Sequence, residues 1–159
     1  MINSMKLIKE TNNFSLLLDC PASKIPKDFF DLPFEKMVKE ILGKNYFVSL
    51  VFVRESKIKA LNKAFRGKDA STDILSFDLE DEGEILISIN NARRKARERE
   101  ENIEEYLAFL FIHGLLHLKG MQHGSKMERK EKKLNEKIQN YSRHRHRHLS
   151  GKGDRRRRG

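Results

Sequence analysis

The 159-residue sequence contains one cysteine, Cys20, so no disulfide can form within the chain. A single cysteine is compatible with a reducing compartment, and we interpret Cys20 as a small apolar residue rather than as a nucleophile. The fold must therefore be stabilised without a covalent cross-link. A chain of this length is long enough to bury a core of its own, and we expect one domain.

Long apolar segments and targeting signals are also lacking. No stretch approaches the roughly 18 uncharged apolar residues that a membrane-spanning helix requires. The N-terminal residues do not combine a basic region, an apolar run and a cleavage site in the order of a secretory signal. We therefore expect a soluble cytoplasmic protein that has no membrane partner.

Positive charge is concentrated at the C-terminal end. The formal net charge is +10, but residues 142–159 alone hold eight Lys or Arg and one Asp, while residues 1–141 hold 25 basic and 22 acidic residues. The larger part is only mildly basic, so net charge gives little support for nucleic-acid binding. We expect residues 1–141 to fold as one domain and the basic, His/Arg-rich tail, whose one apolar side chain is Leu149, to be disordered.

Hydrophobic spacing predicts a chain of strands and helices without internal repeats. We expect an edge strand within residues 5–18 and a strand buried in the centre of the sheet at residues 46–53. Residues 72–79 and 84–89 are expected to form an antiparallel hairpin. Helices are expected at 34–42, 58–65, 90–101 and 103–118, and along Met127, Leu134, Ile138 and Tyr141.

The histidines near residue 120 are the strongest candidates for a metal site. Residues 103–118 are too long and too apolar for a strand, so His113 and His117 lie four apart on one face of a helix. Gly120 can take a left-handed conformation that ends the helix, and the reversed chain can bring His123 back toward the first two rings. Three neutral imidazoles suit zinc and leave a fourth position open, as in hydrolytic zinc sites.

The same histidines could instead be packed core residues. A histidine on an apolar helix is usually a packed core residue, and a pair four apart is weak support for a ligand set. The third histidine beyond a glycine completes H-x-x-x-H-x-x-G-x-x-H, which favours a metal site. One group of zinc proteases shares this outline and has a glutamate base after the first histidine. Here that position is Gly114, which cannot take a proton, so a peptidase is disfavoured.

A second constellation lies in the polar loop between residues 65 and 77. Arg66 offers a planar fork of donors suited to a phosphate, and Lys68 offers a mobile positive charge. Ser71 and Thr72 add hydroxyl groups. Alone this pattern is weak, because basic residues near a turn are mostly solvated surface and Asp73 is equally suited to brace the loop.

Together the two constellations resemble the YbeY family of bacterial metal-dependent endoribonucleases, which are linked to ribosomal RNA maturation. Residues 66–77 are similar to that family's RGKDxxTDVLSF, residues 83–88 to its GDIxIS strand, and residues 113–123 to its HGxLHLxGYDH. These motifs cover most of residues 62–123. The resemblance implies an α+β fold, with a small mixed sheet of about four strands packed by about five helices.

The resemblance also implies a site and a function. His113, His117 and His123 would bind one Zn²⁺ per chain, and Arg66 would be the catalytic basic residue facing it. Substrate-binding residues would be Lys68, Thr72 and Asp73. The domain 1–141 would then be a zinc-dependent endoribonuclease specific for single strands, acting in maturation of the 3′ end of 16S ribosomal RNA and in ribosome quality control. Ribosomal RNA and ribosomal proteins would be its partners, and no DNA is expected.

The chain departs from the family where Met121-Gln122 replaces the usual Tyr-Asp before the last histidine. Gln122 cannot ionise, so any orienting role of that aspartate must pass to an amide hydrogen bond or to another group. This departure keeps open a ribosome-associated RNA-binding maturation factor with little cleavage activity. A zinc peptidase is the third interpretation.

Overall fold

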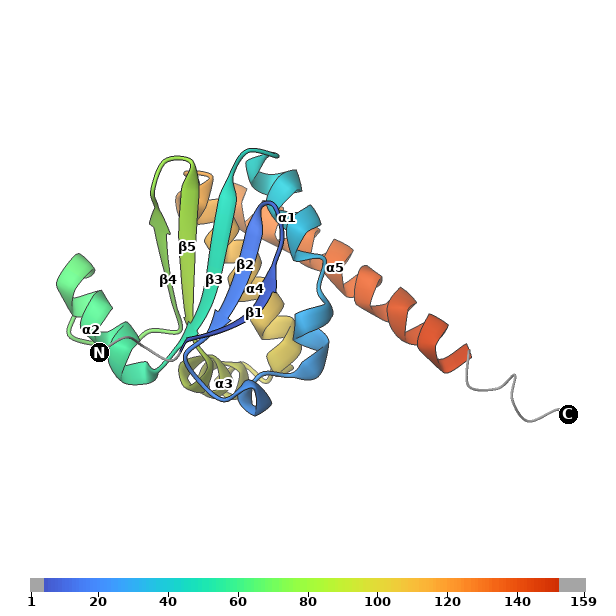
Figure 1. The fold of residues 1–159 in the computed structure, drawn as a ribbon, viewed down its shortest axis with the longest axis horizontal. Helices are drawn as coiled ribbons and strands as arrows, with labels where there is room; N and C mark the ends of the chain where they lie inside the picture. Colours follow the sequence, from blue (N-terminus) through green and yellow to red (C-terminus); the bar gives the residue numbers. More distant parts are fainter. Residues whose placement is uncertain (1–4, 152–159) are drawn as a thin grey trace, which may run out of the picture.

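A five-stranded mixed sheet forms the centre of the protein (Figure 1). The structure is a computed structural model and describes residues 5–151. The strands are β1 (Lys6–Glu10), β2 (Phe14–Leu18), β3 (Phe47–Val53), β4 (Ile74–Asp78) and β5 (Glu82–Ser88), in the order β1-β2-β3-β5-β4. The pairs β1/β2 and β4/β5 are antiparallel, whereas β2/β3 and β3/β5 are parallel. The fold is therefore α+β, as the sequence predicted.

Residues 5–18 form two strands instead of the single edge strand expected. They fold as the hairpin β1/β2, in which β1 is the edge strand and β2 lies inside the sheet. Phe14, Leu16 and Leu18 on β2 are fully buried. The charged residues of β1 obscure its pattern in the sequence, and such residues are typical of a strand edge exposed to solvent. This hairpin raises the strand number to five.

The helices lie where the hydrophobic spacing placed them. They are α1 (Phe34–Leu42), α2 (Glu55–Arg66), α3 (Ile89–Glu98), α4 (Ile103–Leu118) and α5 (Ser125–Gly151), with two short 3-10 helices at Ala22–Lys24 and Lys27–Asp31. No helix of the described residues is both long enough and apolar enough to traverse a lipid bilayer.

The sheet separates two apolar clusters of unequal size. The larger cluster joins one face of the sheet, through Val48, Leu50 and Phe52 on β3, to α1, α4 and α5. The smaller cluster includes Val51 and Val53 on the other face, beneath α2. Because β3 is buried on both faces, its sequence is almost continuously apolar. The larger cluster holds α4 in place, and Figure 1 shows this helix running along the sheet.

Gly114 allows α4 to approach the sheet closely. A Cβ atom built at this position would lie 2.8 Å from Ile85 Cδ1 and 3.1 Å from Ile85 Cγ1 on β5. The 2.8 Å contact is shorter than real side chains tolerate, so a larger residue would require a shift of the Ile85 side chain or of α4. The glycine that removes a general base from the motif thus has a packing role.

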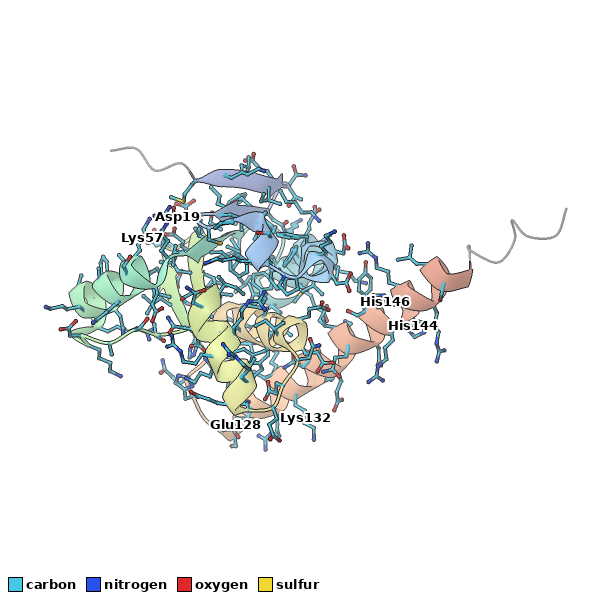
Figure 2. All side chains as sticks on the ribbon, turned by 90° about the horizontal axis from the view of Figure 1, so that it is seen from below. Asp19, Lys57, Glu128, Lys132, His144 and His146 are labelled. Carbon is cyan, nitrogen blue, oxygen red and sulfur yellow. The ribbon has the colours of Figure 1, made fainter. Side chains whose placement is uncertain are left out.

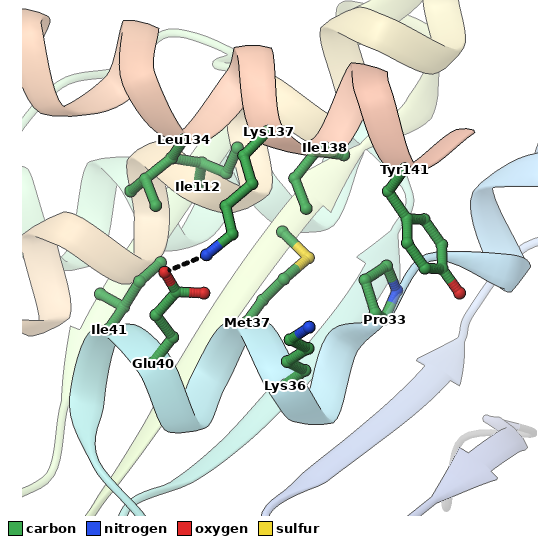
Figure 3. A pocket seen from close by; sticks show the side chains of 10 residues that line it. All are labelled: Pro33, Lys36, Met37, Glu40, Ile41, Ile112, Leu134, Lys137, Ile138 and Tyr141. Atoms are coloured by element: carbon green, nitrogen blue, oxygen red, sulfur yellow. Dashed lines mark hydrogen bonds and ion pairs between the residues drawn. The ribbon is translucent and has the colours of Figure 1, made fainter. Parts of the chain in front are cut away.

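Helix α5 crosses α1 and returns along α4. Figure 3 shows Lys137 of α5 beside Glu40 of α1 at the edge of a small cavity that Met37, Ile112 and Ile138 also line. Lys137 Nζ is 2.6 Å from Glu40 Oε1. This packing fixes the side of α5 that faces the histidine helix. The first turns of α5 therefore reach the metal site.

The disorder expected from residue 142 is wrong for residues 142–151, because α5 continues as a helix to Gly151. Arg145 Nη2 lies 3.0 Å from Asp31 Oδ2, and His146 Nε2 lies 3.5 Å from Asp28 Oδ2. Figure 2 shows His144 and His146 on this part of the helix. Polar contacts with the 3-10 helix Lys27–Asp31 thus replace the missing apolar ones. The rest of the predicted tail, residues 152–159, lies outside the described residues.

Candidate metal centre

The structure brings the three predicted histidines together at the end of α4. His113 and His117 lie on successive turns, Gly120 has the left-handed φ of +93° that the sequence argument required, and the chain turns back to His123. One ligand nitrogen from each histidine lies within 4.8 Å of the others, a grouping that could hold a metal ion. The site is thus formed by a helix and the turn that ends it.

Hydrogen bonds at the outer nitrogens orient two of the imidazoles. His113 Nδ1 is 2.5 Å from Glu131 Oε1, and His117 Nδ1 is 3.1 Å from the carbonyl oxygen of Met121. A carbonyl oxygen and an ionised carboxylate can only accept, so each Nδ1 must donate a proton to its partner. In the neutral rings the Nε2 atoms are then left with free lone pairs. Neutral imidazoles oriented in this way are the usual metal ligands in proteins.

The two free nitrogens face each other across a short gap. His113 Nε2 and His117 Nε2 are 3.0 Å apart. Two lone pairs at this separation repel, and either a shared proton or a metal ion between them removes the repulsion. Zinc binds histidine nitrogen at about 2.0–2.1 Å, which places neighbouring ligands of a tetrahedral ion about 3.3 Å apart. The spacing of the pair is therefore close to that of zinc ligands, and a ligand atom of the exposed His123 lies within 4.8 Å of both.

The surroundings of His117 keep its ring neutral. Partial burial lowers the pKa of His117 below its ordinary value, and the neighbouring His113 and His123 lower it further. A lower pKa leaves the lone pair of Nε2 free at neutral pH, and only this form of the ring binds a metal.

Glu131 contacts the candidate site, and the sequence did not predict it. It lies on α5 with 8% of its surface exposed, and its carboxylate is held against His113. In the lysine- and glutamate-rich sequence of α5 it looks like any other charged residue. One signal was available, because Glu131 is four residues after the buried Met127 and so lies on the inward side of the helix.

Substitution of Glu131 by glutamine is expected to weaken metal binding about 10–100-fold, which is the usual effect of removing an outer partner of a ligating histidine. The amide still fits the space but no longer provides a charged acceptor for His113 Nδ1–H. Competition with a chromophoric chelator measures the affinity. Glu136→Gln, an exposed change on the same helix, is the matched control. Equal affinities of the two variants would contradict a role of Glu131 at the site.

The predicted substrate residues lie in and beside the loop that follows α2. Arg66 is the last residue of α2, and both Arg66 and Lys68 are exposed. Thr72 is half-buried, with Oγ1 3.4 Å from the carbonyl oxygen of Ile74. Within residues 5–151, no hydrogen bond or ion pair connects Arg66, Lys68 or Thr72 to the histidines. The structure leaves their contact with a substrate as a prediction.

Asp73 instead connects this loop to the metal helix. It is 7% exposed, and its Oδ2 accepts a 2.6 Å hydrogen bond from the Tyr106 hydroxyl on α4. Burial and the bond to Asp73 raise the pKa of Tyr106, so the phenol keeps the proton that it donates. Tyr106 precedes His113 by two helical turns. Asp73 therefore braces the loop against the helix that carries His113 and His117.

Asn91 is a second missed residue, and it holds the same loop from α3. Its Nδ2 lies 2.6 Å from Ser71 Oγ and 3.2 Å from the carbonyl oxygen of Thr72. Nothing in the surrounding charged sequence distinguishes this asparagine. The loop is thus held from two helices while Arg66 and Lys68 project from it.

Gln122, which stands where the family has aspartate, is exposed and makes no hydrogen bond to the three histidines within the described part of the chain. The Met121 carbonyl orients His117, and Glu131 orients His113. Gln122 carries no charge and cannot act as an anionic hydrogen-bond acceptor. The Met121 carbonyl and the Glu131 carboxylate therefore orient the two imidazoles in its place.

Comparison with known proteins agrees with this geometry. The family model described as Endoribonuclease YbeY matches residues 22–144. The chain belongs to the YbeY family. A curated Endoribonuclease YbeY from Bacillus licheniformis is 34% identical over 140 residues, which cover 74% of this chain and 88% of the relative. Another, from Geobacillus kaustophilus, is 41% identical over 97 residues, and the match spans 51% of this chain and 62% of the relative.

The YbeY fold is also matched by a solved structure. The solution structure of TM1509 from Thermotoga maritima is 32% identical, with a TM-score of 0.61 over 84% of this chain and 92% of that chain. Family membership confirms the resemblance found in the three sequence motifs. It covers the histidine helix, the Arg66 loop and most of α5.

Proposed function

We propose that this protein is a zinc-dependent endoribonuclease that cuts single-stranded RNA. The facing Nε2 atoms of His113 and His117, 3.0 Å apart, carry the proposal, because their spacing is close to that of two neighbouring ligands of a zinc ion in a YbeY-family chain. The relatives' name, Endoribonuclease YbeY, supports RNA as the substrate. We further propose that the RNA is ribosomal, at the 3′ end of 16S, and that the activity serves ribosome maturation and quality control in the cytoplasm.

In this proposal His113, His117 and His123 hold the zinc ion, and each other residue acts on the ligands or on the substrate. When bound, zinc supplies Lewis acidity, which lowers the pKa of water toward 7 and neutralises charge on a phosphoryl oxygen. Glu131 and the Met121 carbonyl keep two imidazoles in their binding orientation.

Arg66 and Lys68 bind the RNA backbone. The Arg66 guanidinium forms paired hydrogen bonds with the scissile phosphate and stabilises the charge that grows there in the transition state. Lys68 and the Thr72 hydroxyl hold neighbouring phosphates. Asp73 keeps the loop in place through Tyr106. Its role is therefore positioning rather than direct contact.

A single strand suits this site because its ligands lie at the surface. His113 and His117 are half-buried and His123 is exposed, so a phosphate of a flexible strand can reach all three. A partner strand would hinder that approach. The mildly basic domain provides little general attraction for RNA, so we expect ribosomal proteins to help place the substrate, and we expect no DNA substrate.

Cleavage assays with removal of the metal test the function. End-labelled single-stranded RNA, its duplex and an unstructured protein are incubated with zinc-loaded protein, with chelator-treated protein and with treated protein to which zinc is returned. We expect only the single strand to be cut, loss of cleavage on chelation, and recovery with zinc. Binding of RNA without zinc-dependent cleavage would replace the nuclease with the RNA-binding maturation factor. Degradation of the protein substrate would favour the peptidase.

A further inference from the structure

Helix α4 exposes one narrow stripe of side chains to solvent. Between Tyr106 and Leu118 every residue of the helix is buried except Phe109, His113 and His117, which follow one another at intervals of four. Two of these three residues belong to the metal centre. The third, Phe109, is an aromatic residue that packs partly against the larger apolar cluster and is partly open to solvent.

Phe109 continues the metal centre as a row of rings. Its ring centroid is 5.8 Å from that of His113, and on its other side it stacks on Tyr106 at 6.0 Å with an interplanar angle of 26°. The Arg99 guanidinium carbon lies 5.6 Å from the centre of the Phe109 ring and 5.4 Å from that of Tyr106. An aromatic and guanidinium surface therefore leads directly to the first metal-binding histidine.

The charge of Arg99 is already partly compensated. Its Nε is 2.8 Å from Glu101 Oε1, while 48% of its side chain is exposed. This ion pair uses the edge of the guanidinium group and leaves a planar face available. Unpaired bases stack on aromatic rings and on arginine planes, whereas phosphates bind the guanidinium edge. The arrangement thus favours a base over a second phosphate.

We propose that Phe109 and Arg99 form a nucleobase-stacking subsite, which holds an unpaired base beside the phosphodiester at the histidine centre. The inference rests on the proposed function, because it takes single-stranded RNA as the ligand. A base held one helical turn from His113 fixes the strand at the point of cleavage. Since every base has a π-face, the subsite accepts many sequences but excludes bases that are paired in a duplex.

Fluorescence of a base analogue tests the subsite without requiring cleavage. A short oligouridine carries one 2-aminopurine at each position in turn and is added to the metal-free full chain. Stacking quenches this fluorophore, so we expect strong quenching at one position with the wild type. Phe109→Leu preserves apolar packing and is expected to lose the quenching and weaken binding about 5- to 100-fold, as for the loss of one stacked base. Phe109→Tyr is expected to restore both.

Two further variants separate stacking from packing. Arg99→Lys keeps the charge but removes the planar face, and is expected to weaken binding in the same direction. Phe30→Leu is the control for packing, because Phe30 is a partly buried phenylalanine of the 3-10 helix Lys27–Asp31. It makes the same change of side chain at another site and is expected to leave RNA binding unchanged. With zinc present, Phe109→Leu should raise KM more than it lowers kcat.

An abasic nucleotide at the quenched position supplies the decisive comparison. The loss of wild-type affinity caused by the abasic nucleotide should equal the loss of affinity for the intact strand caused by Phe109→Leu. The Phe109→Leu protein should bind the abasic and the intact RNA equally well. Equal losses in both proteins, or quenching that does not depend on Phe109, would overturn the subsite even if RNA is cleaved. Phe109-dependent quenching in a protein that cleaves no RNA would keep the subsite and remove the nuclease proposal.

Discussion

His117→Ala is expected to lose zinc binding and to reduce RNA cleavage to the background of chelated wild-type protein. His117 is the central ligand, because its ring centroid is 4.5 Å from that of His113 and 4.5 Å from that of His123. Its removal leaves the imidazoles of His113 and His123, whose ring centroids are 5.2 Å apart. The Nε2 atom that faces His113 is then lost. Zinc content per chain and cleavage of single-stranded RNA measure the two effects.

The same variant distinguishes a catalytic metal from a structural one. Leu107, Leu110 and Phe111 anchor α4 in the larger apolar cluster, so the helix is held in place without a metal ion. We therefore expect His117→Ala to be folded and to unfold cooperatively on heating. Its midpoint temperature should be close to that of the chelated wild-type protein. His144→Ala, at an exposed histidine of α5, is the matched control and should keep both zinc and activity. A His117→Ala protein that fails to fold would indicate a structural role for the zinc.

The clustering of His113, His117 and His123 could be predicted from the sequence because it depends on local structure. A helical period places His113 and His117 on one face, and one glycine with positive φ returns the chain to His123. Glu131 could not be found in this way. Its contact with His113 spans 18 residues and depends on the direction in which α5 leaves the turn. That direction is set by tertiary packing between α5, α1 and α4.

The errors at both ends of the fold have related causes. Lys6 and Lys9 interrupt the hydrophobic pattern of β1, so this strand cannot be recognised from its own residues. It is defined by its pairing with β2. In the continuation of α5, Arg145 contacts Asp31 across 114 residues of sequence. Composition correctly shows that this segment cannot pack through apolar groups, but it gives no information about a distant acidic partner.

The loop after α2 illustrates what the motif alone cannot resolve. The sequence motif assigns Arg66 as catalytic and Lys68, Thr72 and Asp73 as substrate-binding, yet these residues have different surroundings in the structure. Asp73 is buried against Tyr106, while Arg66 and Lys68 are exposed. A buried carboxylate that accepts a hydrogen bond maintains geometry, and an exposed guanidinium is available to a ligand. Membership of one motif therefore does not imply one role.

Arg66→Ala is expected to lower kcat for RNA cleavage about a hundredfold, while zinc binding stays unchanged. The guanidinium is the group best suited to stabilise charge that develops on the phosphate, and its effect is larger in the transition state than in the bound substrate. Arg66 is exposed at the end of α2, and it forms no ion pair within residues 5–151. Its removal should therefore leave the fold intact. Steady-state cleavage of labelled single-stranded RNA measures kcat and KM.

Two variants on the same helix show whether the shape of the group or its charge matters. Arg66→Lys keeps the charge but loses the planar donor fork, so we expect an activity between those of wild type and Arg66→Ala. Lys63→Ala removes an equal charge from α2, where Lys63 is paired loosely with Asp69 at 3.8 Å. This control should cleave at nearly the wild-type rate. If Lys63→Ala and Arg66→Ala lose activity equally, general attraction of RNA to α2 explains the effect, and Arg66 has no specific role at the phosphate.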